Sequence, residues 1–500
     1  MTVILGLDQG TSSSRAVLMR ADGTLSHIAQ RELPQIYPQP GWVEQDPEAI
    51  WSSQAAAVRA VLGDAGLDPS AIHCIGITNQ RETTVVWERA TGRPIANAIV
   101  WQDRRTADDC AQLATTEHNG CNVESLVSEK TGLVVDAYFS ASKIRWILQH
   151  IPGARSQAQA GQLAFGTVDT WLIWKLTAGR RHITDVSNAS RTLLFNIHTL
   201  TWDNELLEIF EIPRSMLPEV VDSSGNLAVT TELLPNGNIT GIAGDQQAAL
   251  FGQMCLRPGM AKNTYGTGCF LMLQTGTTPI RSPHRLLTTV AWRIASQTNY
   301  ALEGSIFVAG AAIQWLRDGL GILNSAPEVE ALAASVPDSA GVVFVPALTG
   351  LGAPHWDPHA RGAIFGLTRG ATRAHLARAA LEGITLQVAD IVRAMEANSD
   401  NATGGLRVHE LRVDGGASTN DLLMQMQADV LGIPIVRSQT SEATVLGVCY
   451  LAGLGAGIWS NTEELERQWC ESRRFDPQST SEERSRKLAE WHQAIQRARG

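Results

Sequence analysis

The chain has 500 residues, of which 50 are Asp or Glu and 40 are Lys or Arg, so its formal net charge at pH 7 is -10. This acidic balance argues against a protein that binds nucleic acid through its phosphates, because such binding needs a surplus of Lys and Arg. Hydrophobic residues make up 44% of the chain and charged residues 18%, values that are ordinary for globular domains and exclude a disordered chain.

The 7 cysteines are scattered and form no C-x-x-C pair, so the sequence predicts neither a disulfide framework nor a zinc site. The first ten residues contain no basic region and no cleavage site of an export signal. We therefore expect a cytoplasmic protein.

The first predicted element is a β-hairpin. Residues 3–7 are apolar, residues 8–11 have the composition of a turn, and residues 14–19 resume as a strand. A helix is predicted to begin at Pro47, because Asp46 is a favoured N-cap and Pro suits the first helical position. Strand-like runs at 72–78 and 83–87, with helical patterns near 107–113 and 140–149, then indicate mixed α and β order.

A second hairpin is predicted over residues 262–274, with its turn at 265–268. Because it has the layout of the first, we predict two lobes of similar plan with a boundary near residue 252. Helical periodicity follows at 422–431 and 482–499. Residues 443–462 carry no charge and approach the length of a membrane span, but their glycines and the lack of a basic flank favour a helix buried in a soluble core.

Neither of the common nucleotide-binding motifs, G-x-x-x-x-G-K-[ST] and G-x-G-x-x-G, occurs in the chain. The tip of the first hairpin, residues 8–15, instead gathers a glycine, several hydroxyls and the positive charge of Arg15, which together suit an anion. The carboxylate of Asp8 suits Mg²⁺ better than a phosphate. A hydrogen-bonded turn without a ligand would use the same residue types.

Two further glycine-containing clusters precede predicted helices. In residues 241–249, Asp245 begins an apolar helix, where it could serve simply as an N-cap. The uncharged Gln246 and Gln247 beside it favour a hydroxylated neutral substrate. Residues 413–420 run in the order strand, glycine turn and helix start, which can receive a nucleotide or can be a tight connection.

Together these clusters resemble the FGGY carbohydrate kinases, and so do the strings at residues 41–47, 77–84, 101–106, 166–172 and 350–354. The resemblance runs from about residue 3 to about residue 460. It implies an α/β protein with the two-lobed, actin-like (ribonuclease H-like) ATPase fold. Residues 1–252 would form the N-terminal domain, which binds substrate and phosphate, and residues 253–500 the C-terminal domain, which binds the nucleotide.

Within the family, the motifs are most similar to those of the members that phosphorylate glycerol. The resemblance implies transfer of the γ-phosphoryl group of ATP to glycerol, giving glycerol 3-phosphate, with Asp245 as the base and Asp8 serving Mg²⁺. It implies that glycerol is bound by Arg81, Glu82, Trp101, Tyr138, Asp245, Gln246 and Phe270. It implies that ATP is bound by Thr11, Ser12, Ser13, Arg15, Thr267, Gly310, Gln314, Gly416 and Asn420.

Several alternatives stay open at this point. Taken alone, Arg81 and Glu82 could be a surface pair on a strand worth under about 1 kcal/mol, and Trp101 could be a core aromatic. A kinase for another polyol or a pentulose such as xylulose is the first rival. An ATP-driven conformational switch shares the fold but gives Asp245 and Arg81 no task, and a catalytically dead scaffold would not need the listed side chains.

The resemblance also implies partners and regulation. Family members form dimers or tetramers, so we expect a homo-oligomer, with no nucleic-acid partner and no membrane span. Some bacterial members bind fructose 1,6-bisphosphate on an Arg-containing loop before the Gly-Asp-Gln-Gln motif. The corresponding stretch here, Leu227–Thr240, has no Arg or Lys, so we do not expect that form of inhibition.

Overall fold

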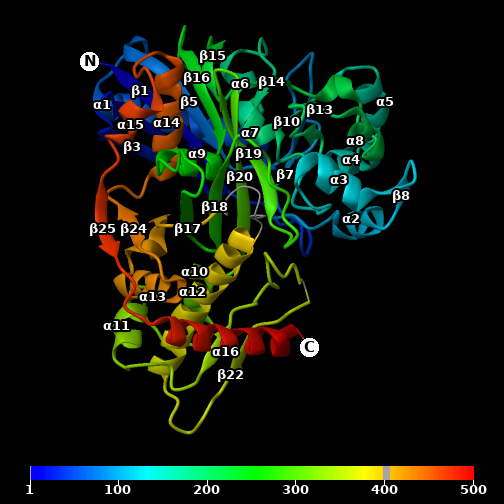
Figure 1. The fold of residues 1–500 in the computed structure, drawn as a ribbon. Helices are drawn as coiled ribbons and strands as arrows, with labels where there is room; N and C mark the ends of the chain where they lie inside the picture. Colours follow the sequence, from blue (N-terminus) through cyan, green and yellow to red (C-terminus); the bar gives the residue numbers. More distant parts are fainter. Residues whose placement is uncertain (1, 358, 398–405, 500) are drawn as a thin grey trace.

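The computed structural model describes residues 2–357, 359–397 and 406–499, and within these ranges thirteen strands form one sheet that runs through both halves of the chain (Figure 1). The N-terminal half contributes β3 (Leu25–Glu32), β2 (Ser13–Arg20), β1 (Val3–Gln9), β5 (Ile72–Asn79), β16 (Asn238–Gly244) and β15 (Ser224–Val229). The C-terminal half contributes β19 (Leu287–Ile294), β20 (Gln297–Ile306), β18 (Cys269–Gly276), β17 (Ala261–Tyr265), β23 (Leu411–Asp414), β24 (Ile435–Ser438) and β25 (Glu471–Phe475).

The two halves repeat one topology. In the N-terminal half the order is β3-β2-β1-β5-β16, with β1, β5 and β16 parallel and β2 antiparallel to β1. In the C-terminal half β20-β18-β17-β23-β24 has the same order and the same directions. The halves join edge to edge through β15 and β19, where the pairing is between Ser224 and Ile294. Two lobes of similar plan, as the paired hairpins predicted, are therefore present.

Two helices cross between the lobes. α9 (Asp245–Gly252) follows β16, and α14 (Ala443–Gly455) from the C-terminal half packs on β16, β5 and β1 of the other lobe. The two helices touch backbone to backbone, since a Cβ on Gly447 would lie 1.8 Å from the carbonyl oxygen of Ala248. Glycine at this contact is required by the approach itself, and the crossing helices fix the lobes against each other.

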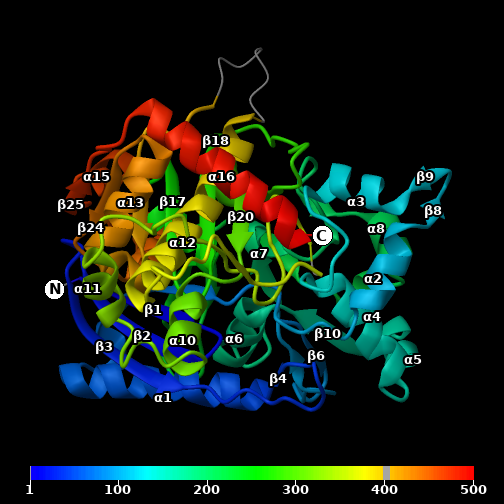
Figure 2. The ribbon, with the colours of Figure 1, turned by 90° about the horizontal axis from the view of Figure 1, so that it is seen from below.

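The remaining helices cover the sheet or form an insertion. α1 (Pro47–Ala65) lies along β2 and β3, as Figure 2 shows, and α6 (Val168–Leu176) packs on β5 and β16. The insertion between β5 and β15 has its own buried core and contains α2 (Ala107–Ala114), α3 (Val123–Thr131), α4 (Ser140–His150), α5 (Ala154–Gln159), α7 (Val186–Ala189) and α8 (Asn204–Ile209). The hairpin β19–β20 packs against this insertion, where Tyr300 donates a hydrogen bond to the carbonyl of Ile197 at 2.7 Å.

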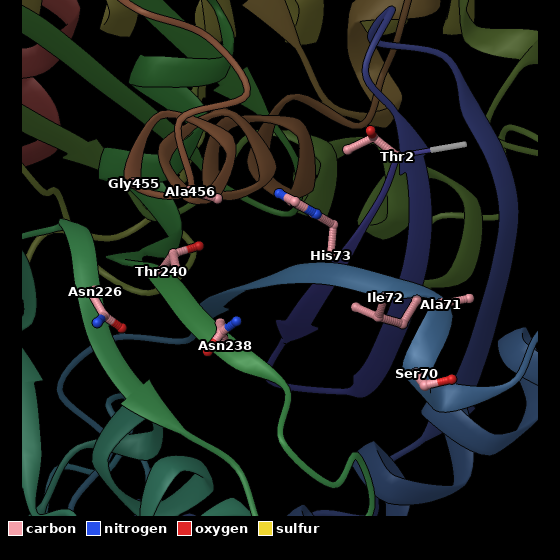
Figure 3. A pocket seen from close by; sticks show the side chains of 10 residues that line it. All are labelled: Thr2, Ser70, Ala71, Ile72, His73, Asn226, Asn238, Thr240, Gly455 and Ala456. Carbon is pink, nitrogen blue, oxygen red and sulfur yellow. The ribbon is translucent and has the colours of Figure 1, made fainter.

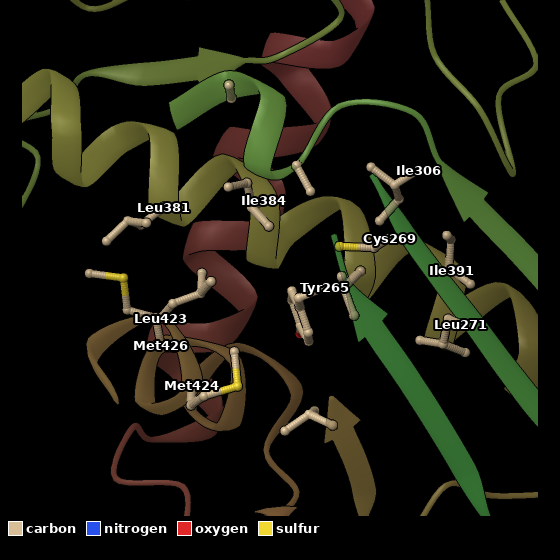
Figure 4. Close-up of a cluster of buried hydrophobic side chains, with 14 of the residues drawn as sticks. Tyr265, Cys269, Leu271, Ile306, Leu381, Ile384, Ile391, Leu423, Met424 and Met426 are labelled. Atoms are coloured by element: carbon tan, nitrogen blue, oxygen red, sulfur yellow. The ribbon is translucent and has the colours of Figure 1, made fainter. Parts of the chain in front are cut away.

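The C-terminal lobe has a separate core (Figure 4). Tyr265, Leu271 and Ile306 from the sheet meet side chains of α12 (Arg373–Ala397) and α13 (Asp421–Leu431). The lobe also carries α10 (Gly310–Asp318), α11 (Glu328–Ala334), α15 (Thr462–Glu466) and the last helix, α16 (Ser481–Arg499). α16 lies across α12 and α13 and buries Leu488, Trp491 and Ile495, in agreement with the helical periodicity predicted at 482–499.

Local signals placed the predicted elements well. Asp46 caps α1 by accepting a hydrogen bond from the backbone N–H of Glu48, and Pro47 occupies the first turn. The segment weighed as a membrane span contains α14, which is buried in the protein and shorter than the predicted range, followed by turns and the start of α15. Among the described residues, no helix has both the length and the apolar composition needed to span a bilayer.

Candidate active site

The site lies where three parallel strands end. In the ladders that join β1, β5 and β16, Asp8 pairs with Thr78 and Gly244 with Asn79, so the carboxyl ends of these strands are adjacent. Asp8 is near the end of β1, Arg81 and Glu82 follow β5, and Asp245 follows β16. Residues far apart in the sequence thus meet at one sheet edge, the usual place for a site in a parallel sheet.

Arg81 is the centre of a buried charge cluster. It donates two hydrogen bonds to the Glu303 carboxylate, at 2.6 and 3.0 Å, and one to Gln247 at 3.2 Å. Its Nε lies 3.1 Å from Asp245 Oδ1 and 3.9 Å from Glu82 Oε1. The Arg81 side chain is 2% exposed, which rules out a surface ion pair with Glu82. Burial opposes the charged guanidinium, but the carboxylates of Glu303 and Glu82 hold the pKa of Arg81 well above its ordinary value.

Glu82 adopts a left-handed backbone conformation, with φ at 58°, which is uncommon for a residue with a side chain. Its carbonyl accepts hydrogen bonds from the hydroxyls of Thr84 and Ser140, both at 3.1 Å. Its carboxylate accepts one from Arg191 Nε at 2.7 Å. Such strain, about 1–3 kcal/mol, persists where surrounding contacts determine the conformation, and it gathers at functional sites.

The glycine of the Gly-Asp-Gln-Gln motif makes room for Arg81. A Cβ at Gly244 would lie 2.8 Å from Cγ and Cδ of Arg81 and 3.0 Å from Oε1 of Gln247. The motif therefore supplies both the acid at the start of α9 and the space through which the arginine reaches it.

Three aromatic side chains predicted to meet the substrate lie together. The Trp101 ring is 5.7 Å from that of Tyr138 and 6.3 Å from that of Phe270, both edge to face. The indole N–H of Trp101 donates to the Thr11 hydroxyl at 2.9 Å, which ties the aromatic group to the first hairpin. The guanidinium of Arg191 lies 5.6 Å from the centre of the Tyr138 ring, so the aromatic group adjoins the charge cluster.

The position of Tyr138 is fixed by its backbone. Its N–H donates to Asp136 at 2.8 Å, and its carbonyl accepts from the ammonium group of Lys143 at 2.5 Å. Lys143 is buried, and burial lowers its pKa to about 8. The insertion thus holds Tyr138 beside Trp101, although the chain between these residues gives no local signal of their contact.

Asp245 and Gln246 face different partners. The Asp245 side chain is 32% exposed and accepts a hydrogen bond from the backbone N–H of Gln246 at 2.7 Å. The Gln246 side chain is buried, and its carbonyl oxygen accepts from the ammonium group of Lys262 at 2.5 Å. Burial lowers the pKa of Lys262, and the charges of Asp414 and Asp245 oppose that shift. Asp245 is therefore the accessible member of the pair.

The first hairpin presents the candidate phosphate ligands. Its turn closes through a hydrogen bond from Gly10 N–H to the Ser13 carbonyl at 2.9 Å, and Ser12 at the tip is exposed. Arg15 lies across the hairpin from Asp8 but also pairs with Glu442 at 2.9 Å, just before α14. The Arg15 charge is thus shared with a carboxylate, which the sequence pattern did not indicate.

The second hairpin supports the start of α10. The carbonyl of Gly266 accepts from Gly310 N–H at 3.0 Å, and that of Thr267 accepts from the N–H groups of Ala309 and Ala311. A Cβ on Gly310 would lie 2.6 Å from the Gly266 carbonyl oxygen, so the close approach needs glycine. Gln314 is exposed on α10, one turn beyond Gly310.

The third cluster lies beside the second hairpin. Gly415, with φ at 86°, passes so close to Tyr265 that a Cβ would lie 2.5 Å from the Tyr265 carbonyl oxygen. Gly416 next to it is exposed and faces open space. Asn420 caps α13 by accepting from Leu423 N–H at 2.8 Å. Gly310 and the turn that contains Gly415 thus adjoin the second hairpin, whereas Thr11, Ser12, Ser13 and Arg15 belong to the first.

The surroundings of Asp8 suit a divalent cation. Burial and the carboxylates of Asp245 and Glu442 raise the pKa of Asp8 to about 7, with Arg15 opposing them. Within the described ranges, no group of three or more His, Cys, Asp or Glu side chains could hold a metal. Mg²⁺ commonly binds through one or two carboxylates and substrate phosphates, so Asp8 beside the candidate phosphate-binding hairpin fits that ion.

A separate cavity of about 570 Å³ lies at the opposite end of β5 (Figure 3). Its lining includes Ile72 and His73 at the start of that strand, together with Asn226, Asn238 and Thr240. Because the charge cluster follows the other end of β5, this cavity is not part of the candidate site.

Among the buried charged residues that sequence reasoning missed are Arg191, Lys262 and Glu303. Arg191 follows α7 and belongs to no recognised motif, while Glu303 and Lys262 lie inside strands. A signal was available for Glu303, since a lone acid directly after the apolar run at 300–302 would have to be buried with a partner. Its partners lie 222 and 112 positions away, which periodicity does not reveal.

Two family models match the chain. The N-terminal domain of the FGGY family of carbohydrate kinases matches residues 3–252, and the C-terminal domain of the same family matches residues 261–456.

Curated relatives are similar over nearly their whole length. A glycerol kinase of Dechloromonas aromatica (strain RCB) is 57% identical over 497 residues, covering 99% of this chain and 97% of that protein. A glycerol kinase of Burkholderia pseudomallei (strain K96243) is 58% identical over 498 residues, covering 99% of this chain and 98% of that protein.

Solved structures share the fold. The crystal structure of Plasmodium falciparum glycerol kinase with ADP superposes with a TM-score of 0.93 at 35% identity, covering 100% of this chain and 98% of that one. A ligand-bound xylulose kinase from Lactobacillus acidophilus has a TM-score of 0.86 at 22% identity, covering 99% and 97%, a likeness of fold alone. The predicted two-lobed α/β fold of the actin-like, ribonuclease H-like ATPases is confirmed.

Proposed function

We infer that this chain, which belongs to the FGGY family of carbohydrate kinases, phosphorylates glycerol with ATP to give glycerol 3-phosphate. Relatives named glycerol kinase, at 57% and 58% identity over almost the full length, support glycerol over xylulose as the acceptor. The observation that carries the proposal is the ion pair between Arg81 and Asp245, because it brings the proposed triol-binding arginine and the proposed base into one cluster.

Glycerol would be recognised by charge and by shape together. Arg81 and Glu82 offer a donor and an acceptor to adjacent hydroxyls, and an acceptor lacking a hydroxyl would leave these buried groups unpaired. Trp101, Tyr138 and Phe270 would pack on the carbon chain and exclude water.

Asp245 would orient the attacking hydroxyl and take its proton. Phosphoryl transfer mainly requires alignment and charge stabilisation, with one carboxylate positioning the nucleophile. Asp245 is partly exposed at the start of α9 and contacts Arg81, which suits that task. The side-chain oxygen of Gln246 accepts a hydrogen bond from Lys262. We therefore propose that Gln246 mainly positions Asp245 and Lys262 and contributes less to glycerol binding.

ATP would lie between the two hairpins. The phosphate oxygens would be bound in the N-terminal lobe by Thr11, Ser12, Ser13 and Arg15. In the C-terminal lobe they would be bound by Thr267 and Gly310. Gln314, Gly416 and Asn420 would surround the rest of the nucleotide. Asp8 would hold Mg²⁺, which would offset phosphate charge when bound.

The division of labour follows from these assignments. We propose that residues 1–252 bind most of the glycerol and part of the phosphate chain, and that residues 253–500 bind the nucleotide, with Phe270 crossing to the acceptor. The homo-oligomeric state and the cytoplasmic location expected from the family stay predictions, which sedimentation and cell fractionation would test.

An acceptor panel tests the proposal directly. ADP release is followed with ATP and Mg²⁺ in the presence of glycerol, erythritol, xylulose or no acceptor. Glycerol should give the highest kcat/KM, and ADP release without an acceptor should be negligible. A higher kcat/KM with xylulose than with glycerol would contradict the assigned substrate. A rate of ADP release that is the same with and without an acceptor would indicate an ATP-driven conformational switch.

A further inference from the structure

We propose that Arg191 and Glu303 are positioning residues of the acceptor site, which set the orientation of Arg81 and Glu82 without touching the substrate. The proposal rests on the proposed function, since it assigns these two residues to the recognition of the triol. Neither residue belongs to a motif from which the site was predicted.

The first step is the hydrogen-bond arrangement of Glu303. Its two carboxylate oxygens accept from both terminal nitrogens of Arg81, and Oε1 also accepts from Arg191 Nη2 at 3.1 Å. Glu303 lies on β20 of the C-terminal half, whereas Arg81 follows β5 and Arg191 follows α7. One carboxylate therefore fixes two arginines from different elements.

The second step is what these bonds leave available. An arginine has five N–H groups, and the terminal nitrogens of Arg81 use three of them on Glu303 and Gln247. One N–H on Nη2 and the Nε–H beside Asp245 remain for the site. On Glu82, Arg191 occupies Oε1, while Oε2 takes no hydrogen bond from the residues that the structure describes. Arg191 and Glu303 thus leave one donor edge of Arg81 and the Oε2 acceptor of Glu82 for the substrate.

The third step concerns charge and burial. Arg81, Glu82, Arg191 and Glu303 form a neutral quartet in which every side chain is at most 2% exposed. Although burial opposes ionisation, the two arginines hold the pKa of Glu303 at about 2. Buried ion pairs are often matched or exceeded in stability by hydrophobic replacements, so stability alone is a weak reason for such a quartet. Fixing the geometry of two charged ligands is a sufficient reason.

Arg191 also reaches the aromatic wall. Its guanidinium lies 5.6 Å from the Tyr138 ring and 5.3 Å from the Phe139 ring, and its buried Nη1 has no hydrogen-bond partner among the described residues. An arginine held against two rings has little freedom to turn, so the orientation it gives to Glu82 is rigid.

The test uses Glu303→Gln, Arg191→Met and the double variant that carries both changes. Each single change leaves an unbalanced buried charge, while the double variant restores a neutral Arg81–Glu82 pair. Asp203→Asn is the matched control, because it removes a bidentate pair with Lys130 in the same insertion and contacts no site residue. Melting temperature, kcat, glycerol KM and ATP KM are measured for all.

We expect the glycerol KM to rise about tenfold or more in both single variants, with ATP KM changed less than about twofold. In the double variant the melting temperature should return towards that of the wild type while the glycerol KM stays raised. Recovery of the glycerol KM together with stability, or an equal rise in ATP KM, would overturn the proposal. If the wild type prefers another acceptor, the assignment of glycerol as the substrate is wrong. The positioning role is then tested with the same variants by the KM of that acceptor.

Discussion

The side chain of Asp245 carries the chemical step of this account, and its removal is the sharpest residue-scale test. Asp245→Asn keeps the size of the group and its place at the start of α9 but removes the charge. We expect kcat to fall by about 10²–10⁴-fold, because general-base contributions have that size. The affinity for ATP, measured by calorimetry, should be retained. Near-normal turnover would exclude Asp245 as the base.

A second residue-scale prediction concerns Gly244. The added methyl group of Gly244→Ala would lie 2.8 Å from Arg81 Cγ and Cδ and would displace that side chain. We expect the glycerol KM to rise, with ATP KM little changed.

Gly63→Ala is the control for this substitution, because a Cβ there meets no atom of the residues that the structure describes within 4 Å. It should leave both KM values unchanged and stabilise the protein by about 0.5–1 kcal/mol, the usual gain in a helix. Unaltered glycerol KM in Gly244→Ala would contradict the role of the glycine.

At this scale the sequence predicts residues that carry a local pattern. Arg81, Glu82 and Asp245 sit in recognisable strings, and the structure brings them into contact. The sequence did not assign Glu303 and Arg191 to the site, because their role depends on partners that lie on other elements. The pairing of Arg15 with Glu442 was missed for the same reason.

At the scale of elements, the docking of α16 depends on one buried carboxylate. Asp390 on α12 accepts from Trp491 at 2.7 Å and from His492 at 3.0 Å, and His355 lies 3.4 Å away. Its hydrogen bond with Asp390 raises the pKa of His492, with Arg393 opposing. Burial alone would raise the pKa of Asp390, but the hydrogen bonds from these partners hold it below its ordinary value.

This arrangement predicts a pH-dependent contribution to stability. Because the pKa of His492 is higher in the folded state, its stabilisation is complete below its ordinary pKa of 6.5 and is lost as pH rises through the folded pKa. The His492 side chain is 50% exposed, so solvent screening limits the effect to under about 1 kcal/mol.

Melting temperatures of the wild type and His492→Ala should therefore differ more at pH 6 than at pH 9. Glu490→Ala, exposed on the same helix, is the control for helix propensity. A difference that grows with pH would have the wrong sign and would contradict the ion pair.

Element existence was predictable because turn residues, caps and periodicity are local. The hairpin β17–β18 and the helices α1, α13 and α16 lie close to their predicted ranges. Strand order was not readable from these signals, since β5 pairs with β1 and β16 across long stretches of chain. The insertion core and the backing of Tyr138 by Lys143 likewise arise only when distant helices pack.

At the scale of the whole molecule, the two lobes share one sheet and two crossing helices. α9 carries Asp245 at its start and packs against α14 from the other half. The proposed base therefore lies on an element that contacts strands of both lobes, while the two hairpins belong to different lobes. The internal repeat explains why each half of the chain carries a hairpin with a glycine-containing turn.

The most direct measurement is a crystal structure of the protein with glycerol, Mg²⁺ and a nonhydrolysable ATP analogue. The account predicts an Asp245 oxygen within about 2.6–3.2 Å of a terminal glycerol hydroxyl, with that hydroxyl facing the γ-phosphate. Glycerol bound away from Arg81, or an Asp245 carboxylate out of reach of every glycerol oxygen, would contradict it.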